Sequence, residues 1–155
     1  MAEIVAAHGG NWLESRMARL GGQFAGIARV EVPATSAAAV RQALAALVAR
    51  GLSVSVAGDA TGSAATVKGT PALLELVGQD RPGIIHQITH VLAVHQVNVE
   101  ELTTECVEAP MAGGILFQAK AEVLVPAGAD MVGLRRDLEK IAGDLMVDLT
   151  FREAK

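Results

Sequence analysis

Apolar residues in the second half of the chain recur first at strand spacing and then at helical spacing. The residues that share one face of the first expected strand are Ala72, Leu74, Leu76 and Gly78. The stripe that predicts the following helix consists of Ile84, Ile85, Ile88, Val91 and Leu92. Between the two lies Asp80-Arg81-Pro82-Gly83, in which Pro82 suits the first turn of a helix. The pattern therefore predicts a strand, a tight turn and an amphipathic helix.

Two strands, a second helix and another strand are expected after this helix. The strand that opens at Asn98 changes phase between Val99 and Leu102, so we expect a bulge near Glu100. The later segments, read as strand, helix and strand in turn, are residues 115–123, 131–141 and 145–151. The order βαββαβ normally folds as a four-stranded antiparallel sheet with two helices on one face.

The first part of the chain repeats some of this pattern. The residues that follow His8 align with those that follow His95, at an offset of 87 residues. Val-Pro-Ala at 32–34 aligns with Val-Pro-Ala at 125–127 at an offset of 93, so the second copy has six extra residues. These extra residues fit the turn between two strands at 108–114. We therefore expect two copies of one unit.

The first copy is incomplete by the same alignment. Its expected elements are a helix over 1–8, strands over 11–19 and 23–32, a helix over 35–50 and a strand over 52–57. About sixteen residues have no counterpart, which removes the first strand, the turn and much of the first helix. That strand is central in a ferredoxin-like sheet. Four explanations stay open. Residues upstream of this sequence form the strand, a neighbouring segment such as Ala65–Lys68 takes its place, another subunit supplies it, or a deletion removed it.

The stretch between the copies, from Ala57 to Ala65, consists of small and polar residues and is typical of a flexible linker. We therefore expect a truncated unit over residues 1–57, a linker over 58–69 and a complete unit over 70–155.

Composition narrows the classes of function. Of the 155 residues 51% are hydrophobic but only 3% are aromatic, so platforms for stacking nucleobases are scarce. The formal net charge is −4, and we expect neither nucleic acid nor a membrane as a direct partner. The single cysteine, Cys106, excludes an internal disulfide and is expected to be a small buried residue of a strand. With no signal-peptide pattern and no apolar run of about 18–20 residues, the expected location is cytoplasmic.

The sequence holds no constellation typical of catalysis or of a cofactor. His86 and His90 are four residues apart on the expected helix, but no third ligand at metal spacing accompanies them, so we expect a solvated helix face. His8 and His95 fall at matched helix ends, where a capping role is expected. We therefore expect no metal, no cofactor and no enzymatic activity. An enzyme would require Asp80, His86 and Glu101 to converge in a closed cavity.

The segment from Asp80 to Ile85 is the candidate binding site. A helix that begins here leaves the N–H groups of Gly83, Ile84 and Ile85 without intrahelical acceptors, which suits a ligand carboxylate. Gly83 allows close approach to the backbone, and Asp80 can pair with an ammonium group. Arg-Pro-Gly is equally consistent with a plain helix start, so the ligand site and the purely structural turn both stay open.

The run Asp80-Arg81-Pro82-Gly83-Ile84, with Asn98-Val99 at the next strand, resembles the signature of the ACT domain and covers nearly all of residues 70–152. In the first copy, Glu14-Ser15-Arg16 followed by Leu20-Gly21 and Phe24 resembles the glycine cleavage system transcriptional repressor family. The resemblance implies an α+β fold of two ferredoxin-like (βαββαβ, ACT-type) units, of which the first lacks its N-terminal strand and part of its first helix.

The resemblance also implies a function. The chain would be a non-catalytic cytoplasmic regulator that senses a small amino acid, with glycine as the candidate, and acts on a transcription factor through protein contact, as a homodimer. The ligand-binding residues that it implies are Asp80, Arg81, Pro82, Gly83, Ile84, Ile85, Asn98 and Asn11. The alternative is an ACT-type dimerisation or scaffold module that binds no ligand.

Overall fold

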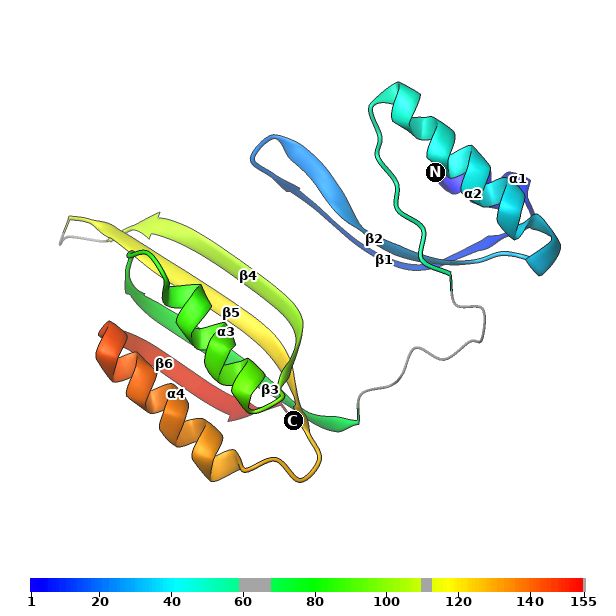
Figure 1. Ribbon diagram of the computed structural model, residues 1–155. Coiled ribbons are helices and arrows are strands. Elements are labelled where there is room, and N and C mark those ends of the chain that lie inside the picture. The colour runs from blue at the N-terminus through cyan, green and yellow to red at the C-terminus, as the bar shows by residue number, and fades with distance from the viewer. Residues whose placement is uncertain (59–67, 110–112, 155) are drawn as a thin grey trace. The chain divides into compact units, whose positions relative to one another are not determined.

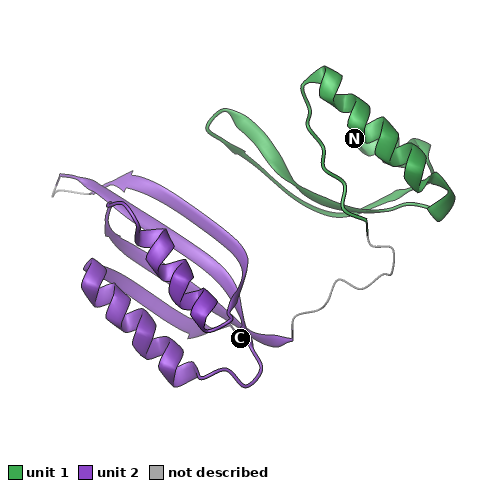
Figure 2. Ribbon diagram, viewed as in Figure 1, with its two compact units in different colours: residues 1–62 green, residues 63–155 purple. Residues whose placement is uncertain are grey.

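The computed structural model describes residues 1–58, 68–109 and 113–154. The chain divides into two compact units, residues 1–62 and 63–155 (Figures 1 and 2). The expected linker over 58–69 lies mostly outside the described residues, and so does the middle of the turn over 108–114.

The second unit is a four-stranded antiparallel sheet covered on one face by two helices (Figure 1). Its elements in chain order are β3 (Gly69–Gln79), α3 (Ile84–Val94), β4 (Asn98–Glu108), β5 (Ile115–Pro126), α4 (Met131–Leu145) and β6 (Val147–Glu153). The strand order is β4-β5-β3-β6, so β3 and β5 are central. This arrangement confirms the ferredoxin-like α+β fold.

The core of the second unit lies between the sheet and its helices. Leu74 and Leu76 on β3 are 2% and 1% exposed, and Leu134 and Leu138 on α4 are fully buried. The buried residues of α3 are Ile84, Ile88, Val91 and Leu92, four of the five in the expected stripe. The register of β4 against β5 shifts between Val99 and Glu101, which confirms the bulge.

A side-chain contact joins the end of α3 to α4. The ring Nε2 of His95 lies 2.9 Å from Oδ2 of Asp137. That hydrogen bond is the main reason why the pKa of the Asp137 carboxyl is lower than its usual value of 3.8. The expected capping role is confirmed for His8, whose Nδ1 lies 2.8 Å from the carbonyl oxygen of Ile4. His95 follows the last residue of α3, but its ring reaches the neighbouring helix instead.

The first unit has a two-stranded antiparallel sheet and a small core. Its elements are α1 (Ala2–Ala7), β1 (Asn11–Leu20), β2 (Gln23–Glu31), the 3₁₀ helix η1 (Ala34–Ser36), α2 (Ala37–Ala45) and the 3₁₀ helix η2 (Ala46–Arg50). The helix expected over 35–50 is thus an α-helix with 3₁₀ turns at both ends. Its core side chains are Val40, Leu44 and Leu47, against which Ile4, Val32 and Val54 pack.

Two sequence-based expectations are wrong. Residues 52–57 form no strand. Their counterpart β6 pairs with β3, and the described part of the first unit contains no counterpart of β3 to hydrogen-bond with them. Cys106 is exposed rather than buried, because it lies on β4, an edge strand of the sheet.

None of the helices within the described ranges is long and apolar enough to cross a lipid bilayer.

Candidate functional site

The turn between β3 and α3 is held at both ends by backbone hydrogen bonds. The N–H of Asp80 donates to the carbonyl oxygen of Ile115 at 2.9 Å, which fixes the turn to the start of β5. The N–H of Gln87 donates to the carbonyl oxygen of Gly83 at 3.0 Å. Gly83 is the N-cap of α3 and has a φ of 92°, which favours glycine. The helix therefore begins at Ile84, and Pro82 precedes the first turn instead of lying in it.

Most residues of the turn are exposed, whereas the first residue of the helix is buried. Asp80, Pro82 and Gly83 are exposed, whereas Ile84 is 2% exposed and Ile85 is half-buried. No side chain in the described part of the chain caps α3. Because the first N–H groups of a helix have no intrahelical acceptor, those of Ile84 and Ile85 are suited to an incoming anion. Arg81, which is half-buried, completes this segment.

Asn98 does not join this turn within one unit. It is the first residue of β4 and pairs with Leu124 of β5, whereas Gln79, at the turn, pairs with Leu116. These two partners are eight residues apart on β5, which at about 3.3 Å per residue is roughly 26 Å. The side-chain amide of Asn98 donates a hydrogen bond to the carboxylate of Glu100. The turn and Asn98 therefore lie at opposite ends of the same sheet.

Asn11 occupies the matching position in the first unit. It is the exposed first residue of β1 and pairs with Glu31, as Asn98 pairs with Leu124. The Asp-Arg-Pro-Gly run occurs once in the chain, at residues 80–83, so the first unit offers the asparagine without the turn.

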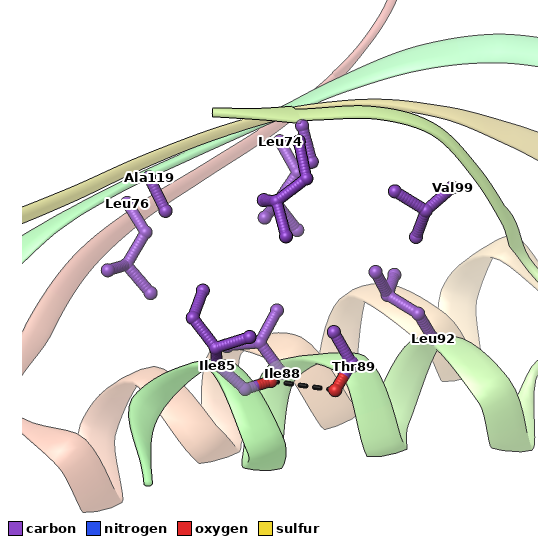
Figure 3. A pocket seen from close by; sticks show the side chains of 10 residues that line it. Leu74, Leu76, Ile85, Ile88, Thr89, Leu92, Val99 and Ala119 are labelled. Carbon is purple, nitrogen blue, oxygen red and sulfur yellow. Dashed lines mark hydrogen bonds between the residues drawn. The ribbon is translucent and has the colours of Figure 1, made fainter. Parts of the chain in front are cut away.

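A small cavity lies between α3 and the sheet, and the sequence did not indicate it (Figure 3). Its volume is about 20 Å³. The residues that line it are Leu74, Leu76, Ile85, Ile88, Thr89, Leu92, Val99, Leu102, Ala119 and Ala121. The hydroxyl of Thr89, its one polar side chain, donates to the carbonyl oxygen of Ile85 at 2.8 Å. An apolar space of this size has room for about one water molecule and is too small for an amino acid.

The three residues that an enzyme would need do not converge. In the register of β4 and β5, Glu101 lies opposite Glu122. The next pair in the register, Leu102 and the buried Ala121, faces the helices. Because successive residues of a strand point to opposite faces, Glu101 projects away from α3, which carries His86. Among the described residues no group of three side chains could hold a metal ion.

The chain belongs to the ACT-domain family, whose pattern matches residues 1–57 and 70–152. It is therefore a tandem ACT-domain protein. ACT domains are a class of regulatory modules that bind small molecules. A UPF0237 protein of Methanopyrus kandleri is 32% identical to it over 80 residues, which is 52% of this chain and 83% of that protein.

Two solved structures resemble nearly the whole chain. An unknown protein from Galdieria sulphuraria has a TM-score of 0.79 at 28% identity, and the match covers 99% of this chain and 88% of that one. A protein provisionally described as a glycine cleavage system transcriptional repressor has a TM-score of 0.67 at 15% identity, over 99% and 86%. The second likeness, at that identity, shows the fold alone. The similarity to that family inferred from the sequence is thus confirmed at the level of architecture.

Proposed function

We propose that this chain is a non-catalytic, cytoplasmic regulator that binds a small amino acid at the Asp80–Ile85 turn and acts on transcription through contact with a protein partner. The observation that carries the proposal is the exposed glycine N-cap of α3, which has no side-chain capping hydrogen bond, in a family of small-molecule-binding modules. Glycine is the first ligand to test, because the description of one structural relative names the glycine cleavage system.

The chemistry of the turn matches the two charges of an amino acid. The ligand carboxylate accepts hydrogen bonds from the N–H groups of Ile84 and Ile85, and the helix N-terminus contributes roughly 0.3–1 kcal/mol to holding the negative charge. The carboxylate of Asp80, exposed at the other side of the turn, pairs with the ligand ammonium. Gly83 has no side chain to obstruct a small ligand.

Asn98 enters the site from a second copy of the chain. β4 is an edge strand of the second unit, so its outer edge can pair with β4 of another copy. Antiparallel pairing places the start of one β4 beside the end of the other, at the end of the sheet where the turn lies. Asn98 then supplies a donor and an acceptor to the ligand held by the turn. Ligand binding therefore favours the paired state of the two copies. This paired state is the signal that the regulator passes to its protein partner in transcription.

A thermal-shift panel of amino acids on the full chain distinguishes this regulator from an ACT-type scaffold that binds no ligand. Glycine, or another small amino acid, is expected to raise the melting temperature, since a ligand at about 100 times its Kd stabilises by roughly 2.7 kcal/mol. Asn98→Ala is expected to weaken this response, whereas Thr150→Ala, an exposed position on β6, leaves it unchanged. Asn11→Ala tests the contribution predicted for the first unit.

A flat panel at millimolar concentrations supports the scaffold and refutes the sensor. A response that Asn98→Ala does not change refutes the composite site but leaves ligand binding at the turn in place.

A further inference from the structure

The solvent face of α3 carries two histidines and no acidic or basic residue of another type. His86 and His90 are four residues apart, and both are exposed. At about 100° per residue, each lies roughly 160° around the helix from the buried Ile88. The eleven residues of α3 include no Asp, Glu, Lys or Arg. Because the outer face of an amphipathic helix normally carries charged side chains, a solvated face alone is an incomplete explanation of this composition.

The two imidazole rings on α3 lie side by side and have no other side-chain partner. Their centroids are 6.5 Å apart, and their planes meet at 29°. Within the ranges that the structure describes, no hydrogen bond or ion pair holds either ring. The other two histidines differ, because the ring of His8 bonds to Ile4 and that of His95 to Asp137. The rings on α3 can therefore rotate toward a common ligand.

Two imidazoles one helical turn apart match the requirements of a transition-metal ion. Side chains at positions i and i+4 have Cβ atoms about 5–6 Å apart. An ion bound to both rings at about 2.0–2.1 Å holds their nitrogens roughly 3 Å apart, which rotation of the exposed side chains allows. Imidazole is a preferred ligand of Cu²⁺, Ni²⁺ and Zn²⁺, and two histidines at this spacing bind zinc in helical HExxH motifs.

A bound ion would act on a helix of low intrinsic propensity. Six of the eleven residues of α3 are β-branched, namely Ile84, Ile85, Ile88, Thr89, Val91 and Val94. β-Branched side chains lose rotamer freedom in a helix and lower its propensity. A metal bridge between positions i and i+4 holds one turn in the helical conformation, so it offsets part of this cost.

We propose that His86 and His90 form a binding site for a divalent transition-metal ion, that water completes the coordination, and that the bound ion stabilises α3. With only two protein ligands the ion is exchangeable, unlike the ion of a four-ligand structural site. Neither histidine belongs to the Asp80–Ile85 turn, so the metal site is independent of the proposed amino-acid site.

Calorimetric titration of the full chain, without an affinity tag, tests the site with Ni²⁺. We expect one ion per chain, with tighter binding of Cu²⁺ and weaker binding of Mn²⁺. His86→Gln and His90→Gln should each raise the dissociation constant at least about tenfold, since even the outer-shell partners of a metal contribute roughly 10–100-fold. His8→Gln and Cys106→Ser remove the other soft or imidazole ligands one at a time and should leave the dissociation constant unchanged.

Relocating one histidine provides the matched control. His90→Gln combined with Ala93→His keeps two exposed imidazoles on α3 but places them seven residues apart, which is about 10.5 Å along the helix axis. One ion cannot bridge that distance, so this double variant should bind Ni²⁺ no more tightly than His90→Gln alone. Saturation with Ni²⁺ should slow amide hydrogen exchange in α3 of the wild type but not of the double variant.

Binding of one ion per chain that requires both histidines at their native spacing supports the proposed site, and slower exchange supports its effect on α3. Three results would overturn the site: no saturable binding, an affinity that His86→Gln and His90→Gln leave unchanged, or full affinity in the double variant. Binding without slower exchange would refute the effect on the helix. Glycine binding is measured on the metal-free chain, so the failure of one proposal is distinguishable from the failure of the other.

Discussion

Replacing Gly83 by alanine tests the geometry of the turn on which the proposed site depends. Gly83 has a φ of 92°, a conformation that costs an L-residue roughly 1–2 kcal/mol. A Cβ added there would have only one neighbour, Nε2 of Gln87 at 4.0 Å, so a steric clash adds nothing. The expected loss is therefore the backbone cost alone, roughly 1–2 kcal/mol. In a unit of this size that lowers the melting temperature by roughly 4–16 °C.

Gly143 provides the matched control. It lies in the exposed part of α4, and an added Cβ would meet nothing within 4 Å. Gly143→Ala is expected to stabilise the second unit by roughly 0.5–1 kcal/mol, because alanine loses less conformational entropy in a helix. The same chemical change thus has opposite signs at the two positions.

Calorimetry and far-UV circular dichroism measure the unfolding of the second unit in both variants. Trp12, the single tryptophan, is in the first unit, so its fluorescence is an internal control that neither substitution should change. If Gly83→Ala is as stable as the wild type, or more stable, the left-handed cap is not present in solution and the reasoning fails.

Three further changes test the packing of α4. Asp130→Ala removes the side chain that accepts a hydrogen bond from the N–H of Gly133 at 2.9 Å, and calorimetry should show a loss of about 1 kcal/mol. Leu138→Ala leaves a cavity at a fully buried position, and chemical denaturation should show a loss of roughly 2–5 kcal/mol. The hydrogen bond with His95 lowers the pKa of Asp137 in the folded state below its ordinary value. The stabilisation by ionised Asp137 is therefore present above the ordinary pKa and is lost as the pH falls through the lower pKa of the folded state. Asp137→Asn should therefore flatten the acid side of the stability curve below about pH 4, and an unchanged acid limb would contradict this role.

The second unit could be predicted from the sequence because its local and long-range signals agree. The stripe from Ile84 to Leu92 became the buried face of α3, and the phase change after Val99 became the bulge of β4. Residues 52–57 show where the same reasoning fails. They carry an alternating pattern, but a strand also needs a neighbour, and alternation does not reveal whether one is present.

The site was predicted only in part for a similar reason. The turn, its glycine and its uncapped helix start follow from local sequence, and the structure places them together. The position of Asn98, in contrast, depends on the long-range pairing of β4, which begins at the far end of the sheet. The fact that Cys106 is exposed depends on β4 being an edge strand, which the spacing of apolar residues does not show.

Backbone amide NMR on the full chain, titrated with glycine and other small amino acids, tests the ligand site most directly. The account predicts saturable shifts of the Gly83, Ile84 and Ile85 amide signals, and their loss in Gly83→Ala. Titrations that leave these three amides unmoved, or that shift a different region, would contradict it.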